Sequence, residues 1–437
     1  MKLYALGGYN EVGKNMCAIE VGKDVVIIDM GVHMDKIVGM DEEERNMPTK
    51  DLIKMGALPN DVLLKGKNVV AIVLTHGHLD HIAAIPRLAE KYNCPIIGTP
   101  YTLEILKNIL ADEKKPQLVK NLYLLSAGEK ATVAHNLDVE FIHMTHSIPD
   151  AVMIALHTKD GIVVHTGDYK LDNNPTIGNA PDYKRLKKLG KLGVKLLLSE
   201  CVRVQDSART EPEYVAKVMV EDALDRAYAD HSAVAITTFA SHIARIRSII
   251  KANRGRREII MIGRSLESYT AAAQRIKLID LEGIKIYGRR KSIGYALKNI
   301  KTKPENYLII STGNQGEPNA VLSRIARKEF EFTFDKEDQV IFSSEVIPNP
   351  VNVANRYVLE RDLKEQGVRL MEGVHTSGHA RREDHRDLIR MLTPKNIIPH
   401  HGETERLASY AALAMEEGYI LGDTVKILYN GAIIDIN

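Results

Sequence analysis

Four residues of the kinds that bind metal ions fall within six positions, in the segment His76-Gly77-His78-Leu79-Asp80-His81. The apolar run that precedes them, residues 69–74, has the composition of a buried strand. If that strand continued, the imidazoles and the carboxylate would point to both faces of the sheet. A tight loop that opens a helix over residues 82–92 can instead gather all four side chains around one or two cations. One aspartate could simply cap that helix, but four such residues predict a metal site. Zinc suits these ligands, and manganese and iron are alternatives.

Three more candidate ligands lie further along the chain. His146 and Asp168 follow apolar runs, and His401 lies in the segment Pro399-His400-His401-Gly402-Glu403. With the first cluster they supply two sets of three ligands and one carboxylate to bridge them. Two cations held in this way lie about 3.5–4 Å apart and share a hydroxide, which is the arrangement that hydrolyses phosphate esters. A lone histidine in a turn is usually structural, so only the combination favours catalysis.

Short apolar runs alternate with helical patterns along the chain, which predicts an α/β architecture. In the first half, the expected strands are residues 25–29, 69–74, 96–97, 139–142, 162–165 and 196–198. From about Thr210 the clusters of ligand-type residues stop, and ligand-type residues resume at His375. Between these points, the expected strands are residues 233–238, 258–263, 307–311 and 339–344. We therefore expect an inserted α/β domain at residues 207–365, within a metal-binding domain formed by residues 1–206 and 366–437.

Length and composition limit the class of protein. With 437 residues the chain is too long for one ordinary core. Its 44% hydrophobic and 27% charged residues are typical of a soluble globular protein, and it has neither a bilayer-spanning run nor a signal peptide. Cys17, Cys94 and Cys201 follow no zinc-knuckle or redox spacing. We expect them to be buried thiols of a protein in the reducing cytoplasm.

The net charge of +2 neither indicates nor excludes a nucleic acid partner. Basic residues gather at 184–195, 245–257 and 289–303. Each segment could be a solvated helix face, but three of them in the middle of the chain suggest a path for a polyanion. Because the chain has no tryptophan and six phenylalanines, backbone contacts should dominate over base stacking.

The metal-ligand pattern, with Asp29 at the end of the first expected strand, resembles the metallo-β-lactamase superfamily. Glu200, His379 and His401 resemble the three motifs of its β-CASP members, which process nucleic acids. Four further segments resemble the ribonuclease J family, namely Thr238-Phe239-Ala240-Ser241, Gly263-Arg264-Ser265, Ser311-Thr312-Gly313-Asn314-Gln315-Gly316-Glu317-Pro318 and Phe342-Ser343-Ser344. The resemblance extends nearly from end to end. It implies a metallo-β-lactamase αββα sandwich with an inserted α/β β-CASP domain.

The resemblance also implies two zinc ions, with manganese possible, bridged by Asp168. One ion would be held by His76, His78 and His146, and the other by Asp80, His81 and His401. Asp29 would orient one of these ligands by a hydrogen bond. His379, supported by Glu200, would protonate or stabilise the leaving 3′ oxygen, although a structural turn histidine is the alternative.

The activity that the resemblance implies is degradation of single-stranded RNA from a 5′ monophosphate in the 5′→3′ direction, releasing nucleoside monophosphates. Ser344, Ser377 and Gly378, together with His379, could surround the terminal phosphate with backbone amides, or could be ordinary turn residues. Relatives further imply a homodimer and a possible RNA-decay complex. The charged segment at residues 36–67 is expected to line the RNA entrance.

Three departures from the patterns of related proteins bear on this interpretation. Bacterial members carry an additional C-terminal domain, and nothing follows Asn437, so we expect the shorter archaeal form. Archaeal cleavage-factor relatives carry N-terminal RNA-binding domains, and none precedes Met1. Glu200 stands where bacterial members commonly have aspartate, which changes the reach of the carboxylate.

Three other functions stay open. An endoribonuclease of the same family would carry the same motifs. A small-molecule hydrolase, such as a lactonase or thioesterase, would need neither the inserted domain nor the His379 motif. A catalytically inactive RNA-binding scaffold would not need seven intact metal ligands.

Overall fold

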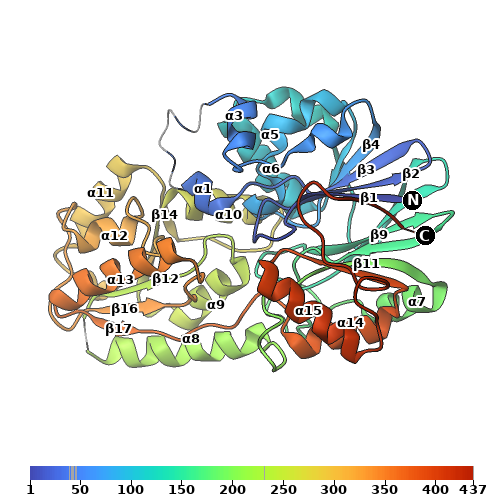
Figure 1. The fold of residues 1–437 in the computed structure, drawn as a ribbon. Coiled ribbons are helices and arrows are strands. Elements are labelled where there is room, and N and C mark those ends of the chain that lie inside the picture. Colours follow the sequence, from blue (N-terminus) through green and yellow to red (C-terminus); the bar gives the residue numbers. More distant parts are fainter. Residues whose placement is uncertain (39, 41–43, 45–46, 231, 437) are drawn as a thin grey trace. The chain divides into compact units, whose positions relative to one another are not determined.

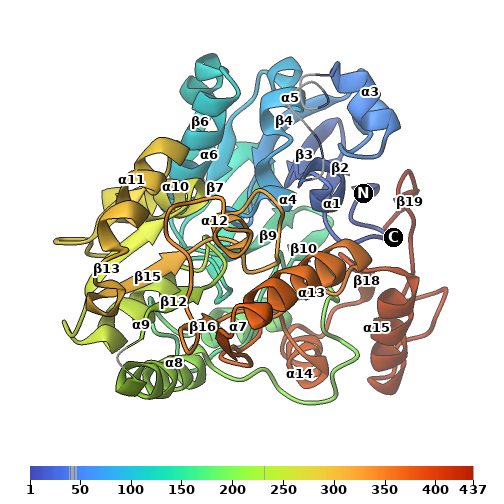
Figure 2. The same ribbon diagram turned by 90° about the vertical axis from the view of Figure 1, so that its left-hand side faces the viewer.

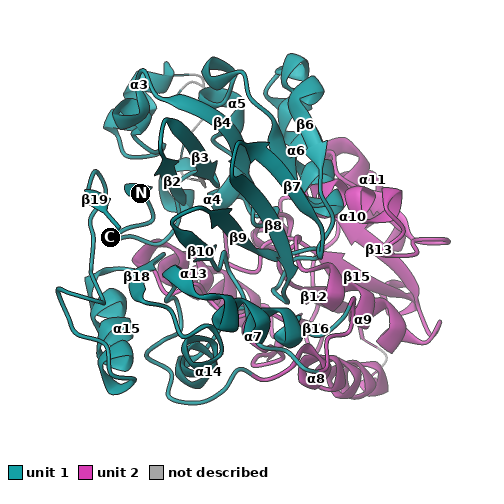
Figure 3. Cartoon of the chain, turned by 90° about the vertical axis from the view of Figure 1, so that its right-hand side faces the viewer, with its two compact units in different colours: residues 1–173, 179–210, 378–437 teal, residues 174–178, 211–377 magenta. Residues whose placement is uncertain are grey.

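The structure is a computed structural model, and it describes residues 1–38, 40, 44, 47–230 and 232–436. The chain divides into two compact units, which Figure 3 shows in teal and magenta. Unit 1 comprises residues 1–173, 179–210 and 378–437, and unit 2 comprises residues 174–178 and 211–377. The predicted domain limits, residues 207 and 365, stay a prediction. Within the described part of the chain, every helix is too short or too polar to cross a bilayer.

Unit 1 contains two mixed sheets (Figure 1). The strands of the first sheet are, in spatial order, β19 (Ile433–Asp435), β1 (Lys2–Gly7), β2 (Met16–Val21), β3 (Asp24–Ile28), β4 (Asn68–Val73), β5 (Ile96–Gly98) and β6 (Leu122–Leu124). Those of the second sheet are β18 (Asn396–His400), β11 (Val194–Glu200), β10 (Gly161–His165), β9 (Val152–Thr158), β8 (Leu137–His143) and β7 (Lys130–Ala134). All six strands that the apolar runs of the first half predicted are confirmed.

One apolar core lies between these two sheets. Val26 of β3 and Ala71 of β4 share it with Val139 of β8, Leu156 of β9 and Val163 of β10. Alternate residues of the same strands face outward and are buried as well, because helices cover the outer faces. This explains why the strands appear in the sequence as continuous apolar runs rather than as an alternation. The unit is thus a sandwich of two sheets between two helical layers.

The helices of unit 1 form these outer layers (Figure 1). Those in the first half of the chain are α1 (Met34–Val38), α3 (Thr49–Lys54), α4 (Leu79–Ile82), α5 (Ile85–Leu88) and α6 (Pro100–Asp112), with 3-10 turns at Asp61–Leu64, Glu90–Tyr92 and Pro116–Asn121. Those on the second sheet are α7 (Tyr183–Leu192), α14 (Arg382–Leu392) and α15 (Thr404–Glu416). Leu186, Leu388 and Leu407, one from each of these last three helices, enter a second core against that sheet.

The helix expected over residues 82–92 is not continuous. It is divided into α4, α5 and the 3-10 turn that follows. The amide of Ala84 donates to the carbonyl of Met30 instead of extending α4, and Pro86 has no amide to donate. The backbone of this segment is therefore tied to the loop after β3, which holds the metal-ligand cluster beside Asp29.

Only part of the charged segment at residues 36–67 can be compared with its prediction. Residues 39, 41–43, 45 and 46 lie outside the described residues. The remainder contains the end of α1, helix α3 and the turn Asp61–Leu64. A role at the RNA entrance stays a prediction.

Unit 2 contains a single sheet whose strand pairs are all parallel. In spatial order its strands are β14 (Lys285–Tyr287), β13 (Glu258–Ile262), β15 (Tyr307–Ser311), β12 (Val234–Thr237), β16 (Gln339–Phe342) and β17 (Arg369–Met371). The four strands that the apolar runs predicted are its central ones. The chain passes from β12 to β13 toward one edge of the sheet and from β15 to β16 toward the other edge. The direction of the connections therefore reverses between the neighbouring strands β12 and β15. In such sheets the carboxyl ends of the two strands at this reversal form a crevice.

Helices cover both faces of this sheet, and Figure 2 shows α12 and α13 in front of it. They are α8 (Glu213–Ala227), α9 (Ile243–Asn253), α10 (Arg264–Arg275), α11 (Arg290–Ile300), α12 (Val321–Ala326) and α13 (Pro350–Glu365), with 3-10 turns at Tyr228–Asp230 and Pro304–Asn306. Leu297, Leu322 and Leu363, from α11, α12 and α13, pack on one face of the strands. Helices α8 and α9 lie together on the other face.

Candidate metal centre

The ends of five strands of unit 1 carry the predicted ligands. In the first sheet, β3 and β4 are parallel, so Asp29 and His76 emerge at the same edge. In the second sheet β8, β10 and β18 run in one direction, with β9 and β11 between them. His146, Asp168 and His401 follow these three strands within a few residues. The two edges together bring all seven predicted ligands into two groups of four that share Asp168.

The first group contains His76, His78, His146 and Asp168, with the ligand atoms within 4.8 Å of one another. His78 Nδ1 lies 3.1 Å from His76 Nε2 and 3.2 Å from His146 Nε2. Asp168 Oδ2 lies 3.7 Å from each of these two Nε2 atoms. Three ring nitrogens and one carboxylate oxygen therefore face a common point, which suits a tetrahedral metal ion.

The second group contains Asp80, His81, His401 and again Asp168. The same Oδ2 atom of Asp168 lies 3.4 Å from His81 Nε2 and 3.5 Å from His401 Nε2. Asp80 Oδ2 lies 3.8 Å from His81 Nε2 and 3.7 Å from His401 Nε2. One oxygen thus belongs to both groups, as a bridging carboxylate would.

The chemistry of the donors fits a metal ion. Asp168 Oδ1 is buried and has no hydrogen-bond partner within the described part of the chain. His146 donates from Nδ1 to the carbonyl of Gly378 at 2.7 Å, which leaves Nε2 with a lone pair toward the cluster. Burial and neighbouring imidazoles lower the pKa of His76 and His146 well below the usual value. Both rings are therefore neutral at pH 7, which is the form that binds metals.

The cluster also attracts positive charge. Burial lowers the pKa of His81, but the carboxylates of Asp168, Asp80 and Asp29 outweigh it and raise that pKa well above the usual value. Burial opposes ionisation of Asp168, yet His401 and His81 hold the pKa of its carboxyl well below the usual range. The His/Asp cluster is compatible with binding of a metal ion.

Asp29 lies behind the ligands rather than among them. Its Oδ2 is 2.7 Å from His81 Nδ1 and accepts a 2.7 Å hydrogen bond from the Thr75 hydroxyl. Its Oδ1 accepts from the Thr75 amide at 2.8 Å. The carboxylate thereby fixes both the tautomer and the orientation of His81, with Nε2 toward the cluster.

The backbone is strained at the strand ends that carry these side chains. Asp29 has φ = 57° and His401 also has φ = 57°, in the left-handed region that non-glycine residues rarely adopt. Gly167, before Asp168, has φ = 55°, and a Cβ there would lie 2.6 Å from Thr75 Cβ. Strain of this kind often marks functional sites.

Glu200 and His379 lie next to the cluster as a pair. His379 Nδ1 is 3.4 Å from Glu200 Oε1, and the Glu200 side chain is fully buried. The His379 ring lies 4.9 Å from the ring of His146 and 6.1 Å from that of His401. Burial lowers the pKa of His379, but the Glu200 carboxylate outweighs it and raises that pKa above the usual value. His379 and Glu200 thus form an ion pair beside the cluster.

The predicted phosphate-binding residues are divided between the two units. Ser344 follows β16 and Ser377 ends unit 2, whereas Gly378 and His379 belong to unit 1. Ser344 and Ser377 are 5% and 3% exposed. Ser344 Oγ has no hydrogen-bond partner within the described residues, so it is a buried donor free to bind a ligand.

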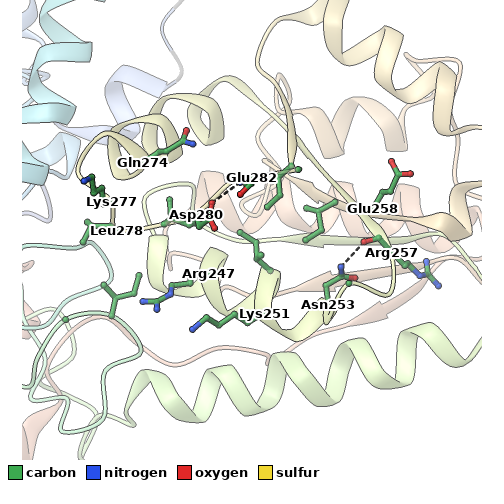
Figure 4. A pocket seen from close by; sticks show the side chains of 18 residues that line it. Arg247, Lys251, Asn253, Arg257, Glu258, Gln274, Lys277, Leu278, Asp280 and Glu282 are labelled. Carbon is green, nitrogen blue, oxygen red and sulfur yellow. Dashed lines mark hydrogen bonds between the residues drawn. The ribbon is translucent and has the colours of Figure 1, made fainter.

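The basic segment at residues 245–257 offers fewer free cations than the sequence suggested. Arg245 is 0% exposed, so it cannot contact a polyanion, and Arg257 is 9% exposed. Arg254 and Arg256 both pair with Asp225. Arg247 and Lys251 of α9 remain, and both line a pocket of about 990 Å³ in unit 2, seen in Figure 4. Asp280 and Glu282 line the same pocket, so acidic and basic side chains both face it.

Sequence reasoning missed three groups around the cluster. Thr75 bridges Asp29 and the imidazoles, and its position directly before His76 was an available signal. The Gly378 carbonyl holds His146, but a backbone group leaves no mark in a residue pattern. Asn15 donates from Nδ2 to the carbonyl of Asp80 at 3.2 Å, from a loop with no metal-binding motif.

Three family models match the chain. The metallo-beta-lactamase superfamily model matches residues 10–196, and the ribonuclease J beta-CASP domain model matches residues 231–360. The model of the Zn-dependent metallo-hydrolase RNA specificity domain matches residues 368–427.

Full-length relatives agree with these matches. Ribonuclease J of Pyrococcus abyssi is 47% identical over 100% of this chain and 97% of its own length. Ribonuclease J of Methanocaldococcus jannaschii is 46% identical over 99% of this chain and 98% of its own length. The chain belongs to the ribonuclease J family. Its fold is therefore a metallo-β-lactamase domain with an inserted β-CASP domain, as the motifs predicted.

More distant likenesses extend the comparison. Ribonuclease J of Synechocystis is 31% identical over 100% of this chain but only 66% of its own length. A solved structure of a protein of unknown function from Enterococcus faecalis V583 has a TM-score of 0.67 at 16% identity and covers 99% of both chains. At that identity the second likeness concerns the fold alone.

Proposed function

We propose that this ribonuclease J family member is a zinc-dependent exoribonuclease that degrades single-stranded RNA from a 5′ monophosphate in the 5′→3′ direction, releasing nucleoside monophosphates. The observation that carries the proposal is the pair of ligand groups sharing Asp168 Oδ2. The names of the relatives, and the RNA specificity in the name of the model that matches residues 368–427, support RNA as the substrate.

In this proposal His76, His78 and His146 hold one zinc ion, and Asp80, His81 and His401 hold a second. Zinc is favoured over manganese by the five imidazoles among seven ligands. Bound zinc would polarise the phosphate and lower the pKa of its water to about 7. Asp168 would contact both ions, and Asp29 keeps His81 in the tautomer that leaves Nε2 free to bind one of them.

His379 has the role of the general acid. Glu200, 3.4 Å from Nδ1, raises the pKa of His379 above its usual value and so favours the protonated ring. The proton passes from His379 to the 3′ oxygen that leaves when the phosphodiester bond breaks. A general acid of this kind contributes about 10²- to 10⁴-fold to the rate.

The proposed ligands of the 5′ phosphate are Ser344, Ser377, Gly378 and His379. A buried hydroxyl without a partner among the described residues, as at Ser344, favours this assignment because burial of an unpaired donor is costly unless a ligand pairs with it.

The homodimer, the RNA-decay complex and the cytoplasmic location stay predictions. The last is supported by three buried free cysteines.

The test is a time course on single-stranded RNA labelled at its 5′ end, with either a monophosphate or a triphosphate there. We expect immediate release of labelled mononucleotide from the monophosphate substrate and resistance of the triphosphate. Labelled fragments of intermediate length from both substrates would instead identify an endoribonuclease. Loss of activity after chelation, with recovery in zinc, checks the metal.

A further inference from the structure

Arg245 is the most deeply buried large side chain of the protein that carries a charge. It lies on α9 of unit 2 and is 0% exposed. Its carboxylate partner is Glu213, the first residue of α8, which is 3% exposed. Nε donates to Glu213 Oε1 at 2.7 Å and Nη2 to Oε2 at 3.0 Å, a bidentate pair. Burial opposes ionisation of Glu213, but His242 and Arg245 hold its pKa well below the usual range.

The third nitrogen of Arg245 holds two chain segments that lie outside the helices. Nη1 donates to the carbonyl and the hydroxyl of Ser343, both at 3.0 Å, and to the carbonyl of Val374 at 3.2 Å. The Ser343 hydroxyl in turn donates to the Val374 carbonyl at 2.9 Å. The segment after β16 and the segment that follows β17 are therefore fastened to each other and to one guanidinium.

Glu213 fastens the second segment at another point. Its Oε2 accepts from the Thr376 hydroxyl at 3.4 Å and lies 3.4 Å from His242 Nε2. The His242 ring accepts the amide of Arg245 at Nδ1, so its proton is on Nε2, toward Glu213. The ion pair is thus the centre of a network in which each polar group has a partner.

Stability alone does not account for such a pair. Replacing a buried ion pair with apolar side chains of similar volume is often neutral or stabilising, because desolvation of two charges offsets their attraction. What the pair does supply is position. The residues it holds, Ser343 and Thr376, directly precede Ser344 and Ser377 in the chain.

We propose that Arg245 and Glu213 are positioning residues that fix Ser344 and Ser377 for recognition of the RNA 5′ phosphate. The inference rests on the proposed function, because it assigns Ser344 and Ser377 to that phosphate. Donors that are held in place before the ligand arrives bind it without a further loss of chain entropy. A guanidinium that contacts both segments is suited to this, since lysine could not form the fork and the Nη1 contacts together.

The test compares Arg245→Lys and Glu213→Gln with a matched control. Arg257→Lys is that control, because Arg257 is a buried arginine of the same unit that donates to the carbonyls of Ser232 and Tyr307, at the amino ends of β12 and β15. Initial rates are measured on two RNAs that differ only in a 5′ monophosphate or a 5′ hydroxyl.

We expect Arg245→Lys and Glu213→Gln to lower the ratio of the monophosphate rate to the hydroxyl rate at least tenfold, through KM for the monophosphate RNA. The rate on hydroxyl RNA should stay within twofold of wild type, and Arg257→Lys should keep the wild-type ratio. An equal fall on both RNAs, or an unchanged ratio, would overturn the proposal.

Hydrogen exchange without RNA gives a readout that does not depend on the activity. Peptides covering residues 343–345 and 374–377 should exchange faster in Arg245→Lys than in wild type or in Arg257→Lys. The strands β12 and β15 of Arg245→Lys should exchange as in wild type. Unaltered exchange there overturns the positioning role. If wild type shows no preference for a 5′ monophosphate, the proposed function fails, and the exchange data still decide whether the pair positions these segments.

Discussion

The orientation of an imidazole that faces the metal centre depends on the group that contacts its other ring nitrogen. His81 is held by Asp29 and His146 by the Gly378 carbonyl. His379 faces the same region but is paired with Glu200 instead. Neighbouring histidines can therefore have different tasks, and single substitutions can separate a metal ligand from a proton donor.

We expect His81→Ala to lose one of two bound metal ions and His379→Ala to keep both, with activity lost in each. For His379→Ala the expected fall in kcat is about 10²- to 10⁴-fold, because only the general acid is removed. Metal content is measured by elemental mass spectrometry. The control is His135→Ala, because His135 lies in an exposed turn. Loss of metal from the His379 variant would contradict its assignment as a proton donor.

At this scale the sequence indicated which side chains gather in the two groups but not the backbone groups that hold them. The signal was clear because four of the seven side chains are nearly consecutive and the others follow apolar runs. Arg245 was misplaced, since a charged residue in a basic helix is ordinarily on the surface, and only the partner Glu213, 32 residues away, permits its burial. Such long-range compensation has no signal in a local pattern.

Secondary structure elements were predictable where burial is complete. The central strands of all three sheets are continuous apolar runs. By contrast β14 and β17, at the two edges of the unit 2 sheet, have three residues each and are at most half-buried. These edge strands are defined by their hydrogen bonds to a neighbouring strand, and no local sequence pattern indicates that pairing. The prediction of one continuous helix at residues 82–92 failed for a similar reason, since the amide of Ala84 donates to the carbonyl of Met30 in the loop after β3.

Glu140 joins three elements of unit 1, and its ionisation should appear in the pH dependence of stability. It lies on β8, 5% exposed, and accepts from Arg185 Nη2 of α7 at 2.7 Å, with His157 Nε2 of β9 2.6 Å away. Burial opposes ionisation, but these two partners lower the pKa of Glu140 from 4.5 to about 2. The contribution of the carboxylate to folding is thus complete above pH 4.5 and is lost as the pH falls toward 2.

Glu140→Gln should therefore lower the free energy of unfolding by roughly 3–4 kcal/mol at pH 7, at about 1.4 kcal/mol for each unit of pKa. The difference from wild type should shrink between pH 4.5 and 2, measured by denaturant titration at several pH values. Asp138→Asn is the matched control on the same strand, since its salt bridge to Lys130 is partly exposed and worth about 1 kcal/mol or less. A difference independent of pH would contradict the ionic origin.

At the scale of the whole molecule, the inserted residues of unit 2 leave the predicted metal ligands together in unit 1. The seven ligands of the two groups all belong to unit 1, although residues 211–377 of unit 2 intervene in the chain before His401. The proposed positioning pair Arg245 and Glu213 belongs entirely to unit 2. The predicted metal ligands thus all belong to unit 1, whereas the predicted phosphate-binding residues are divided between unit 2, with Ser344 and Ser377, and unit 1, with Gly378 and His379.

This division predicts a local response to metal. Zinc added to chelator-treated protein should slow amide exchange in β3, β4, β10 and β18, because an ion that binds only the folded centre stabilises it. At a free zinc concentration of 100 times Kd, the free energy of unfolding of unit 1 should rise by about 2.7 kcal/mol. Exchange that requires opening of unit 1 should then be about a hundredfold slower. The strands of unit 2 should exchange at the same rate with and without zinc, and His81→Ala should show a smaller response in unit 1. Equal slowing in both units would mean that the metal stabilises the chain as one cooperative body, and it would contradict a response confined to unit 1.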